Sequence, residues 1–297
     1  MTCPRFVRQG DVVMGTRRCS QRQFFLRPDP ATDQLFLYCL ARAVRVTGVA
    51  LHEFQVLSNH YHVVFTDLRG NRPEFFRELN QFVARGVNAQ LGRWENVFAP
   101  GSYNAVRLVD GDAIEDECLY TLCNVVKDGL VKLPEYWDGV CSWSMEYGES
   151  RVIRRPDGFF RPSMREQEVL TLVRPDALYP ELDDASARAQ LRARAKERSY
   201  ALVENRLASG GSFLGMTRVR RQSPFGAPKS RTPRRDLRPT VAGRNTPARV
   251  EALREYTQFL EDHRTARLAY ESGNRDVVFP HGTYLMRVRF GVPVAKN

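Results

Sequence analysis

Two histidines in a β-favouring segment are the residues of this chain best placed for chemistry. His60 and His62 lie in residues 56–65, where side chains alternate between the two faces of a strand, so both imidazoles are expected on one face. Two neutral imidazoles converging from one strand can hold a divalent cation. Because two half-exposed histidines on an edge strand give the same pattern, the motif needs support from elsewhere in the chain.

A tyrosine and an asparagine supply that support. Tyr120 and Asn124 are four residues apart in a segment that predicts a helix, so they share one helix face. A helical tyrosine taken alone is usually a half-buried packing residue. Combined with His60 and His62, however, this pair offers a nucleophilic phenol and a third metal ligand.

The elements that must position these residues follow from apolar periodicity. The patterns predict strands over residues 12–18, 49–57, 60–65 and 103–109, and helices over 33–47 and 73–91. A third helix carries residues 119–127, and the acidic residues between 110 and 117 precede or open it. Ser58-Asn59 turns the second strand into the third, and Asp128-Gly129 ends the third helix. The order β-α-β-β-α-β-α predicts an α+β fold in which helices cover one face of an antiparallel sheet.

The basic excess lies in the C-terminal half. Residues 1–147 hold 16 Lys and Arg against 17 Asp and Glu, a net charge of −1, whereas residues 148–297 hold 29 against 17, a net charge of +12. We therefore expect a catalytic domain over 1–147 and a basic, partly helical extension over 148–297, with a flexible stretch at about 209–247. An Arg-rich extension favours a polyanionic partner over a merely solvated tail.

Composition narrows the class of protein. Hydrophobic residues make up 42% and charged residues 27% of the 297 residues, as in ordinary globular proteins. The chain has no long apolar run and its N-terminus does not resemble a signal peptide, so we expect a cytoplasmic, nucleoid-associated protein without a membrane partner. Its six cysteines lack a Cys-x-x-Cys spacing, which disfavours a zinc ribbon or a disulfide framework.

Four segments together resemble the single-tyrosine HUH transposases, the insertion-sequence and REP-associated tyrosine transposase superfamily, in which U is a hydrophobic residue. Residues 57–64 look like the metal-binding strand of that family, and residues 120–131 are similar to its Tyr-x-x-x-Asn-Pro-Val-x-Ala-Gly-Leu-Val segment. Residues 13–18 and 88–98 resemble its first strand and its Asn followed by a Gly/Trp-rich stretch. The resemblance covers about residues 8–145. It departs at Val125, where the family commonly has proline, and at Asp128, where it has alanine.

The resemblance implies an RRM/ferredoxin-like HUH fold and a DNA transposase or endonuclease. Such an enzyme cleaves and rejoins single-stranded, hairpin-bearing DNA through a 5′-phosphotyrosine. Tyr120 would be the nucleophile, while His60, His62 and Asn124 would hold Mg²⁺ or Mn²⁺. Imidazole ligands favour softer metals, so these two metals are expected from availability and from the family. The implied partners are single-stranded or hairpin DNA and a second copy of the chain, as a homodimer.

Basic and aromatic side chains are the candidates for DNA contact. The basic candidates are Arg17, Arg18, Arg93, Lys127, Arg218, Arg220, Arg221, Arg231, Arg234 and Arg235. The aromatic candidates for base stacking are Tyr61, Trp94, Phe98 and Tyr103, each of which fits core packing equally well. Two other functions stay open: a domesticated, non-catalytic nucleic-acid-binding protein, and an HUH nuclease that initiates replication or conjugation. Nucleases of the latter kind often carry a second tyrosine, which the Tyr120 helix lacks.

Overall fold

The computed structural model describes residues 4–99, 103–230 and 239–296. Its elements are β1 (Asp11–Arg18), η1 (Ser20–Arg22), α1 (Pro30–Thr47), β2 (Ala50–Leu57), β3 (His60–Asp67), α2 (Arg72–Leu91), β4 (Asn104–Leu108), α3 (Gly111–Lys127), η2 (Pro134–Tyr136), β5 (Ser150–Arg154), β6 (Gln167–Thr171), α4 (Asp184–Ala208), α5 (Met216–Arg220), β7 (Val241–Ala242), α6 (Thr246–Glu271) and α7 (Leu285–Phe290).

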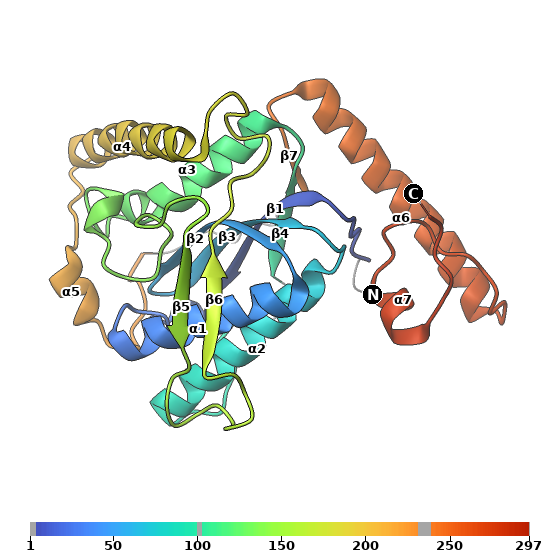
Figure 1. Cartoon of the computed structure of the whole chain (residues 1–297), viewed down its shortest axis with the longest axis horizontal. Coiled ribbons are helices and arrows are strands. Elements are labelled where there is room, and N and C mark those ends of the chain that lie inside the picture. Colours follow the sequence, from blue (N-terminus) through green and yellow to red (C-terminus); the bar gives the residue numbers. More distant parts are fainter. Residues whose placement is uncertain (1–3, 100–102, 231–238, 297) are drawn as a thin grey trace.

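A five-stranded sheet forms the centre of the molecule (Figure 1). Its strand order is β2-β3-β1-β4-β7, and the pairs among β1 to β4 are antiparallel. The short strand β7 comes from the extension and pairs with β4 in parallel. Together with the helices, this mostly antiparallel sheet confirms the predicted α+β class.

Local signals explain where the helices begin and end. The Asp29 side chain caps α1 by accepting from Thr32 N, and Gly48 ends that helix with a φ of 71°, which glycine adopts without a steric cost. The Asp110 side chain caps α3 in the same way by accepting from Ala113 N. Gly48 and Asp110 lie at helix ends predicted from the sequence, whereas α1 begins at Pro30, three residues before the predicted start.

Helices lie on both faces of the sheet. The face that carries Tyr61 packs against α1 and α2, where the Phe36 and Tyr61 rings lie 5.4 Å apart and the Phe65 and Phe75 rings 4.6 Å apart. The sequence predicts helices over one face of the sheet, and α1 and α2 are the helices that cover this face. Helix α3 lies on the opposite face, onto which His60 and His62 project, and it packs against β2 and β3. The side chains of His60 and His62 therefore point from the sheet toward α3.

The extension packs onto this frame. Strands β5 and β6 form a hairpin beside α1, held by Arg45 on the buried Glu168 (2.6 Å), and α4 runs along α3 (Figure 1). The stretch expected to be flexible contains the short elements α5 and β7, and its residues 231–238 lie outside the described ones. Val219 of α5 is fully buried in a cluster with Leu57 and Val125, so contacts with distant residues order a segment that has no periodic pattern of its own.

A buried ion pair joins the extension to the sheet. Arg188 of α4 and Glu53 of β2 form this pair with both side chains 0% exposed. Arg188 Nε also donates to Met145 O at 2.8 Å, and the Tyr147 hydroxyl donates to Glu53 Oε1 at 3.0 Å. The pair is stable in the fold because these further hydrogen bonds accompany the ionic contact.

Loss of the Arg188 cation is expected to be costly. Arg188→Met should lower the free energy of unfolding by about 3–5 kcal/mol, because it leaves the Glu53 carboxylate buried without a counter-charge. Adding Glu53→Gln should recover part of that loss, since a neutral amide can still accept from Tyr147. Denaturant unfolding of the three proteins measures both effects. Equal stability of Arg188→Met and the unsubstituted protein would contradict this account.

Acidification is expected to destabilise the fold through His52 of β2. Its Nδ1 donates to Val173 O (2.6 Å) and its Nε2 accepts from Thr66 Oγ1 (2.7 Å). Burial lowers the pKa of His52 to about 4, so between about pH 6.5 and pH 4 the unfolded chain binds the proton more tightly. Stability therefore falls as the pH falls through this window, by up to about 3 kcal/mol. His52→Gln should flatten the unfolding free energy against pH; an unchanged slope would refute this.

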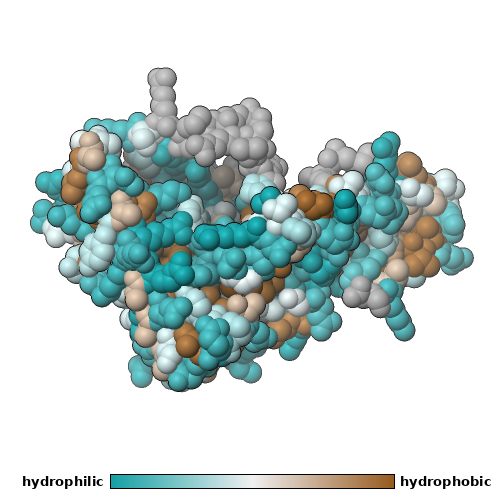
Figure 2. Space-filling view, turned by 90° about the horizontal axis from the view of Figure 1, so that it is seen from above, coloured by the Kyte–Doolittle hydropathy of each residue, from teal (hydrophilic) through white to brown (hydrophobic). Residues whose placement is uncertain are grey.

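The last 51 described residues, 246–296, form a C-terminal arm beside the sheet (Figure 1). The arm has its own small core around Phe279 and Met286. It is fastened by Glu255, which pairs with Arg8 (2.7 Å) and Arg107 (2.8 Å). A hydrophobic patch is visible over this end of the molecule in Figure 2. Exposed hydrophobic residues of the arm include Leu268, Val278, Leu285, Val288 and Phe290.

Across the three described ranges, no helix is both long enough and apolar enough to cross a membrane.

Candidate active site

Strand β3 and helix α3 bring the four catalytic candidates together. The His60 and His62 rings lie 5.0 Å apart at 86°, and the Tyr120 ring lies 5.3 Å from that of His62 at 88°. The Asn124 amide nitrogen lies 3.0 Å from His62 Nε2. A phenol, two imidazoles and an amide thus converge between one strand and one helix. The residue spacing predicts that each pair shares a face, and the packing of α3 against β3 brings the two pairs together.

Both imidazoles are held neutral. Burial lowers the pKa of His60 to about 4, and the nearby Arg18 cation adds to this effect, while a hydrogen bond with Asn124 opposes it. Burial also lowers the pKa of His62 well below its ordinary value, and His60 and Lys127 contribute further. Neutral imidazole is the form that binds a metal ion, so protons do not compete for these nitrogens at neutral pH.

Asn59 fixes the tautomer of His60. Its Nδ2 donates to Arg22 O at 3.1 Å, which turns its Oδ1 toward His60 Nδ1 at 2.7 Å. Because a carbonyl oxygen only accepts, His60 Nδ1 must carry the proton. The lone pair of His60 then lies on Nε2, on the side of the ring that faces α3. An oriented imidazole of this kind is typical of metal ligands.

The donor set at this site fits a divalent cation. Asn124 Nδ2 donates to the lone pair of His62 Nε2, and the buried His62 Nδ1 has no hydrogen-bond partner within the described residues. A rotation of the Asn124 amide would present its oxygen instead, giving two imidazole nitrogens and one oxygen as ligands. Among the described residues, no group of three or more His, Cys, Asp or Glu side chains could hold a metal ion, so a three-ligand set at this site depends on the Asn124 amide.

Asp128 is a site residue that the sequence reasoning did not include. Its Oδ2 lies 4.0 Å from His60 Nε2, and the carboxylate is 44% exposed. Partial burial raises the pKa of the Asp128 carboxyl, while the positive charges of Lys127 and Arg18 lower it. The signal was its spacing, since Asp128 follows Asn124 by four residues and therefore continues the same helix face.

Lys127 places a positive charge at the candidate nucleophile. Its Nζ lies 3.3 Å from the Tyr120 hydroxyl oxygen and 4.4 Å from the centre of the Tyr120 ring. Tyr120 is half-buried and Lys127 is exposed, so solvent and a polymer substrate can reach this end of the site. The ammonium orients the hydroxyl and places a positive charge beside it.

The register between β1 and β3 separates the basic candidates. Arg18 lies opposite His60 and therefore points to the site face, where it is exposed. Arg17 lies opposite Tyr61 and points to the other face, where it donates to Ala99 O at 2.9 Å. Arg93 is 14% exposed and lies over the Phe25 ring, at 4.0 Å from its centre. The structure thus brings Arg18 to the site but neither Arg17 nor Arg93.

The basic candidates of the extension differ among themselves. Arg218 and Arg221 are exposed, whereas Arg220 forms an ion pair with Asp138. The remaining three, Arg231, Arg234 and Arg235, lie outside the described residues.

Only one of the four aromatic candidates for base stacking has an open ring. Trp94 is 88% exposed, while Tyr61 and Phe98 are buried in the core. Tyr103 stacks on Phe76 at 3.7 Å between ring centres. Core packing therefore accounts for three of these aromatic residues.

No protein-family model matches the sequence, and no curated protein sequence does. A solved structure described as a REP-associated tyrosine transposase bound to a REP hairpin is similar to 48% of this chain and 82% of its own, with 17% identity and a TM-score of 0.41. A second, described as a "putative transposase" from Deinococcus radiodurans R1, is similar to 36% of this chain and 85% of its own, with 18% identity and a TM-score of 0.28. The chain is thus similar, over part of its length, to solved transposase structures.

Proposed function

We propose that this chain is a DNA transposase that cleaves and rejoins single-stranded, hairpin-bearing DNA through a 5′-phosphotyrosine. The observation that carries the proposal is the convergence of Tyr120, His60, His62 and Asn124 between β3 and α3. A phenol beside two neutral imidazoles is an uncommon combination for a purely structural site. The combination suits phosphoryl transfer, in which a positioned nucleophile attacks a charge-compensated phosphate.

The residues support a balanced cleavage step. Tyr120 Oη would attack the scissile phosphorus in line and form an oxygen–phosphorus bond, while the bond from phosphorus to the 3′ oxygen breaks. The phenol proton passes to solvent, and the departing 3′ oxygen takes up a proton to leave a free 3′-OH. Rejoining reverses these events. It needs no ATP, because the phosphotyrosine bond conserves the energy of the phosphodiester.

The polar and charged side chains around Tyr120 have separate roles in this proposal. His60, His62 and Asn124 would hold Mg²⁺ or Mn²⁺, which when bound supplies Lewis-acid stabilisation of the phosphate charge. Asp128, 4.0 Å from His60 Nε2, would add an oxygen donor on the same side. Lys127 and Arg18 carry positive charge at the two ends of the site, where they would orient the flanking phosphates.

DNA and a second copy of the chain are the proposed partners. The net charge of +12 over residues 148–297 supports phosphate binding beside a nearly neutral catalytic part. Arg218 and Arg221 are exposed residues that could contribute to it. Tyr120 contacts His62 of its own chain, so one copy contains the whole proposed centre. The homodimer would then serve to hold two DNA ends rather than to complete the site.

The proposal is tested by covalent capture. The full chain is incubated with a library of hairpin-bearing single strands labelled at the 3′ end, with Mn²⁺ or Mg²⁺, and resolved under denaturing conditions. We expect labelled protein, and mass spectrometry of its peptides should locate the nucleotide on Tyr120. If the strands bind and no adduct forms with either metal, the chain is a non-catalytic nucleic-acid-binding protein instead.

A further inference from the structure

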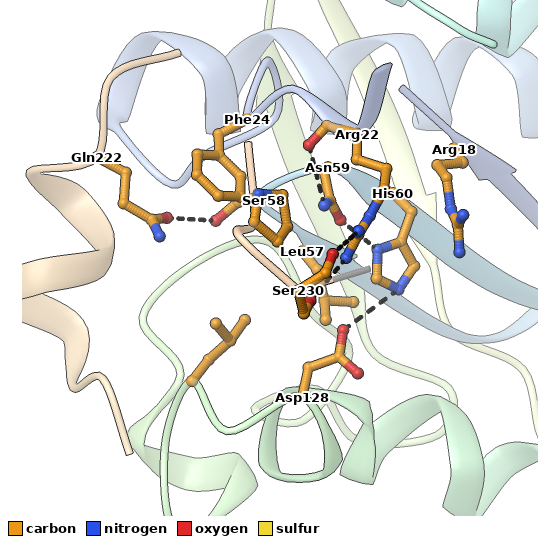
Figure 3. Close-up of a pocket in the computed structure, with 12 residues that line it drawn as sticks. Arg18, Arg22, Phe24, Leu57, Ser58, Asn59, His60, Asp128, Gln222 and Ser230 are labelled. Carbon is orange, nitrogen blue, oxygen red and sulfur yellow. Dashed lines mark hydrogen bonds and ion pairs between the residues drawn. The ribbon is translucent and has the colours of Figure 1, made fainter. Parts of the chain in front are cut away.

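A pocket of about 280 Å³ opens beside His60 (Figure 3). Ser58 and Asn59 of the turn between β2 and β3 form one part of its wall, and Gln222, Pro228 and Ser230 form the part that the extension supplies. Tyr120 and His62 do not line it. The volume is close to the lower end, about 300 Å³, of pockets that hold small molecules, so it suits one nucleotide rather than a duplex.

The extension wall is a fixed part of the fold. Leu214 N and Gly215 N donate to Gly129 O and Leu130 O at 2.9 and 2.8 Å, just after α3. Farther along, Gly226 O accepts from Phe24 N at 2.9 Å. These backbone hydrogen bonds tie the extension to the catalytic part both before and after Gln222. The pocket therefore lies between segments that are fixed to each other by hydrogen bonds.

The lining chemistry matches an unpaired nucleobase. The Phe24 ring, Leu57, Leu130 and Pro228 supply apolar surface, which a base can stack on or pack against. The Gln222 amide hydrogen-bonds Ser58 Oγ at 3.3 Å, so one end of that amide is fixed.

Gln222 and Arg18 each have polar groups at this pocket that are available to bind a nucleotide. The other end of the Gln222 amide has no partner within the described residues and can read a base edge, as amides commonly do. Arg18, at the rim, has no ion pair in the described part of the chain and can take a backbone phosphate. Base and phosphate recognition are thus both available at one pocket.

The position of the pocket defines which nucleotide it takes. Tyr120, Asn124 and Asp128 follow one another along one face at the C-terminal end of α3, and the eight residue-to-residue steps from Tyr120 to Asp128 span about 12 Å. Asp128 lines the pocket, while Tyr120 is at the other end of this row. In an in-line attack the leaving 3′ oxygen departs on the side opposite the nucleophile. The nucleotide that carries this oxygen therefore lies on the pocket side.

We infer that this pocket binds the unpaired base of the nucleotide that ends in the new 3′-OH, and that the extension, through Gln222, sets the base preference at the cut. The inference rests on the proposed cleavage reaction for the identity of the nucleotide. The pocket itself requires only single-stranded DNA. Its test can therefore be divided into a binding measurement and a cleavage measurement.

The binding arm uses the full chain, EDTA and fluorescein-labelled octamers of dA, dC, dG and dT, followed by anisotropy. We expect the best and worst octamers to differ by about tenfold in Kd, the size of one base-specific contact. Gln222→Ala should reduce this ratio to about threefold or less, and the isosteric Gln222→Glu should change which base is preferred, because a carboxylate only accepts. Gln258→Ala, at an exposed glutamine on α6, is the matched control and should keep the ratio. Thermal melts of all variants establish that they fold.

The cleavage arm sequences the released 3′ ends from the hairpin library. The unsubstituted chain should favour one base at the last nucleotide, and Gln222→Ala should lose that preference at this position alone. Octamers that bind equally, or a 3′-end preference that survives Gln222→Ala while adducts form, would overturn the inference and leave the proposed function intact. A third outcome is that the chain distinguishes the octamers through Gln222 but forms no adduct. That outcome would support base binding in the pocket and refute the strand-transfer reaction.

Discussion

Tyr120→Phe is expected to abolish the covalent protein–DNA adduct, with a loss of cleavage of roughly 10⁴-fold or more, the order seen when a catalytic nucleophile is removed. The substitution removes one oxygen and keeps the ring that packs edge-on against His62 at 5.3 Å. The fold and the neighbouring imidazoles should therefore remain in place. Single strands labelled at either end give the readout on a denaturing gel: the 3′ label should move with the unsubstituted protein, and the 5′ label should be released.

A second tyrosine supplies the control for this result. Tyr200 on α4 is 56% exposed and lies outside the site, so Tyr200→Phe should give the normal adduct yield. Circular dichroism and the melting temperature should not distinguish the two variants from the parent protein. An adduct that persists in Tyr120→Phe would show that a different side chain is the nucleophile.

Substitution of His60 is expected to remove cation binding and, with it, cleavage. Asn59 holds the His60 lone pair toward α3, so His60→Ala deletes an oriented ligand and not merely a nearby ring. We expect Mn²⁺ affinity to fall by at least about 100-fold, beyond the 10- to 100-fold effects of residues that only support a ligand. The electron paramagnetic resonance signal of free Mn²⁺ measures this directly, without DNA or turnover.

The same experiment has a histidine control and a clear contrary outcome. His281 lies in the C-terminal arm, so His281→Ala should leave both Mn²⁺ affinity and adduct yield unchanged. Excess EDTA should reproduce the cleavage defect of His60→Ala in the unsubstituted protein, and added Mn²⁺ should reverse it. Full Mn²⁺ affinity in His60→Ala would remove this histidine from the cation site, whatever happened to cleavage.

Much of the structure of residues 1–147 can be predicted from interactions between residues that are close in the sequence. Alternation along residues 60–65 places His60 and His62 on one strand face, and the four-residue spacing places Tyr120 and Asn124 on one helix face. The caps at Asp29 and Asp110 and the turn at Ser58-Asn59 are local features as well. Each depends on interactions within a few residues, so each leaves a readable pattern.

Two adjacent arginines, Arg17 and Arg18, show what local sequence patterns do not predict. Strand alternation predicts that Arg17 and Arg18 point to opposite faces, but it does not say which of them joins the histidines. The register of β1 against β3 decides this by pairing Arg18 with His60 and Arg17 with Tyr61. Register is a relation between strands more than 40 residues apart in the chain.

By itself, then, the sequence determines the strand with two histidines, the helix with Tyr120 and Asn124, and the α+β class, because periodicity and capping are short-range. Only the tertiary structure decides that α3 lies on the histidine face, that β7 adds to the sheet, and that Gln222 closes a pocket beside His60. Gln222 meets Ser58 across 164 positions of sequence, and Val241 meets Arg107 across more than a hundred. Such contacts are stabilised by burial and hydrogen bonds between distant segments, and no local periodicity encodes them.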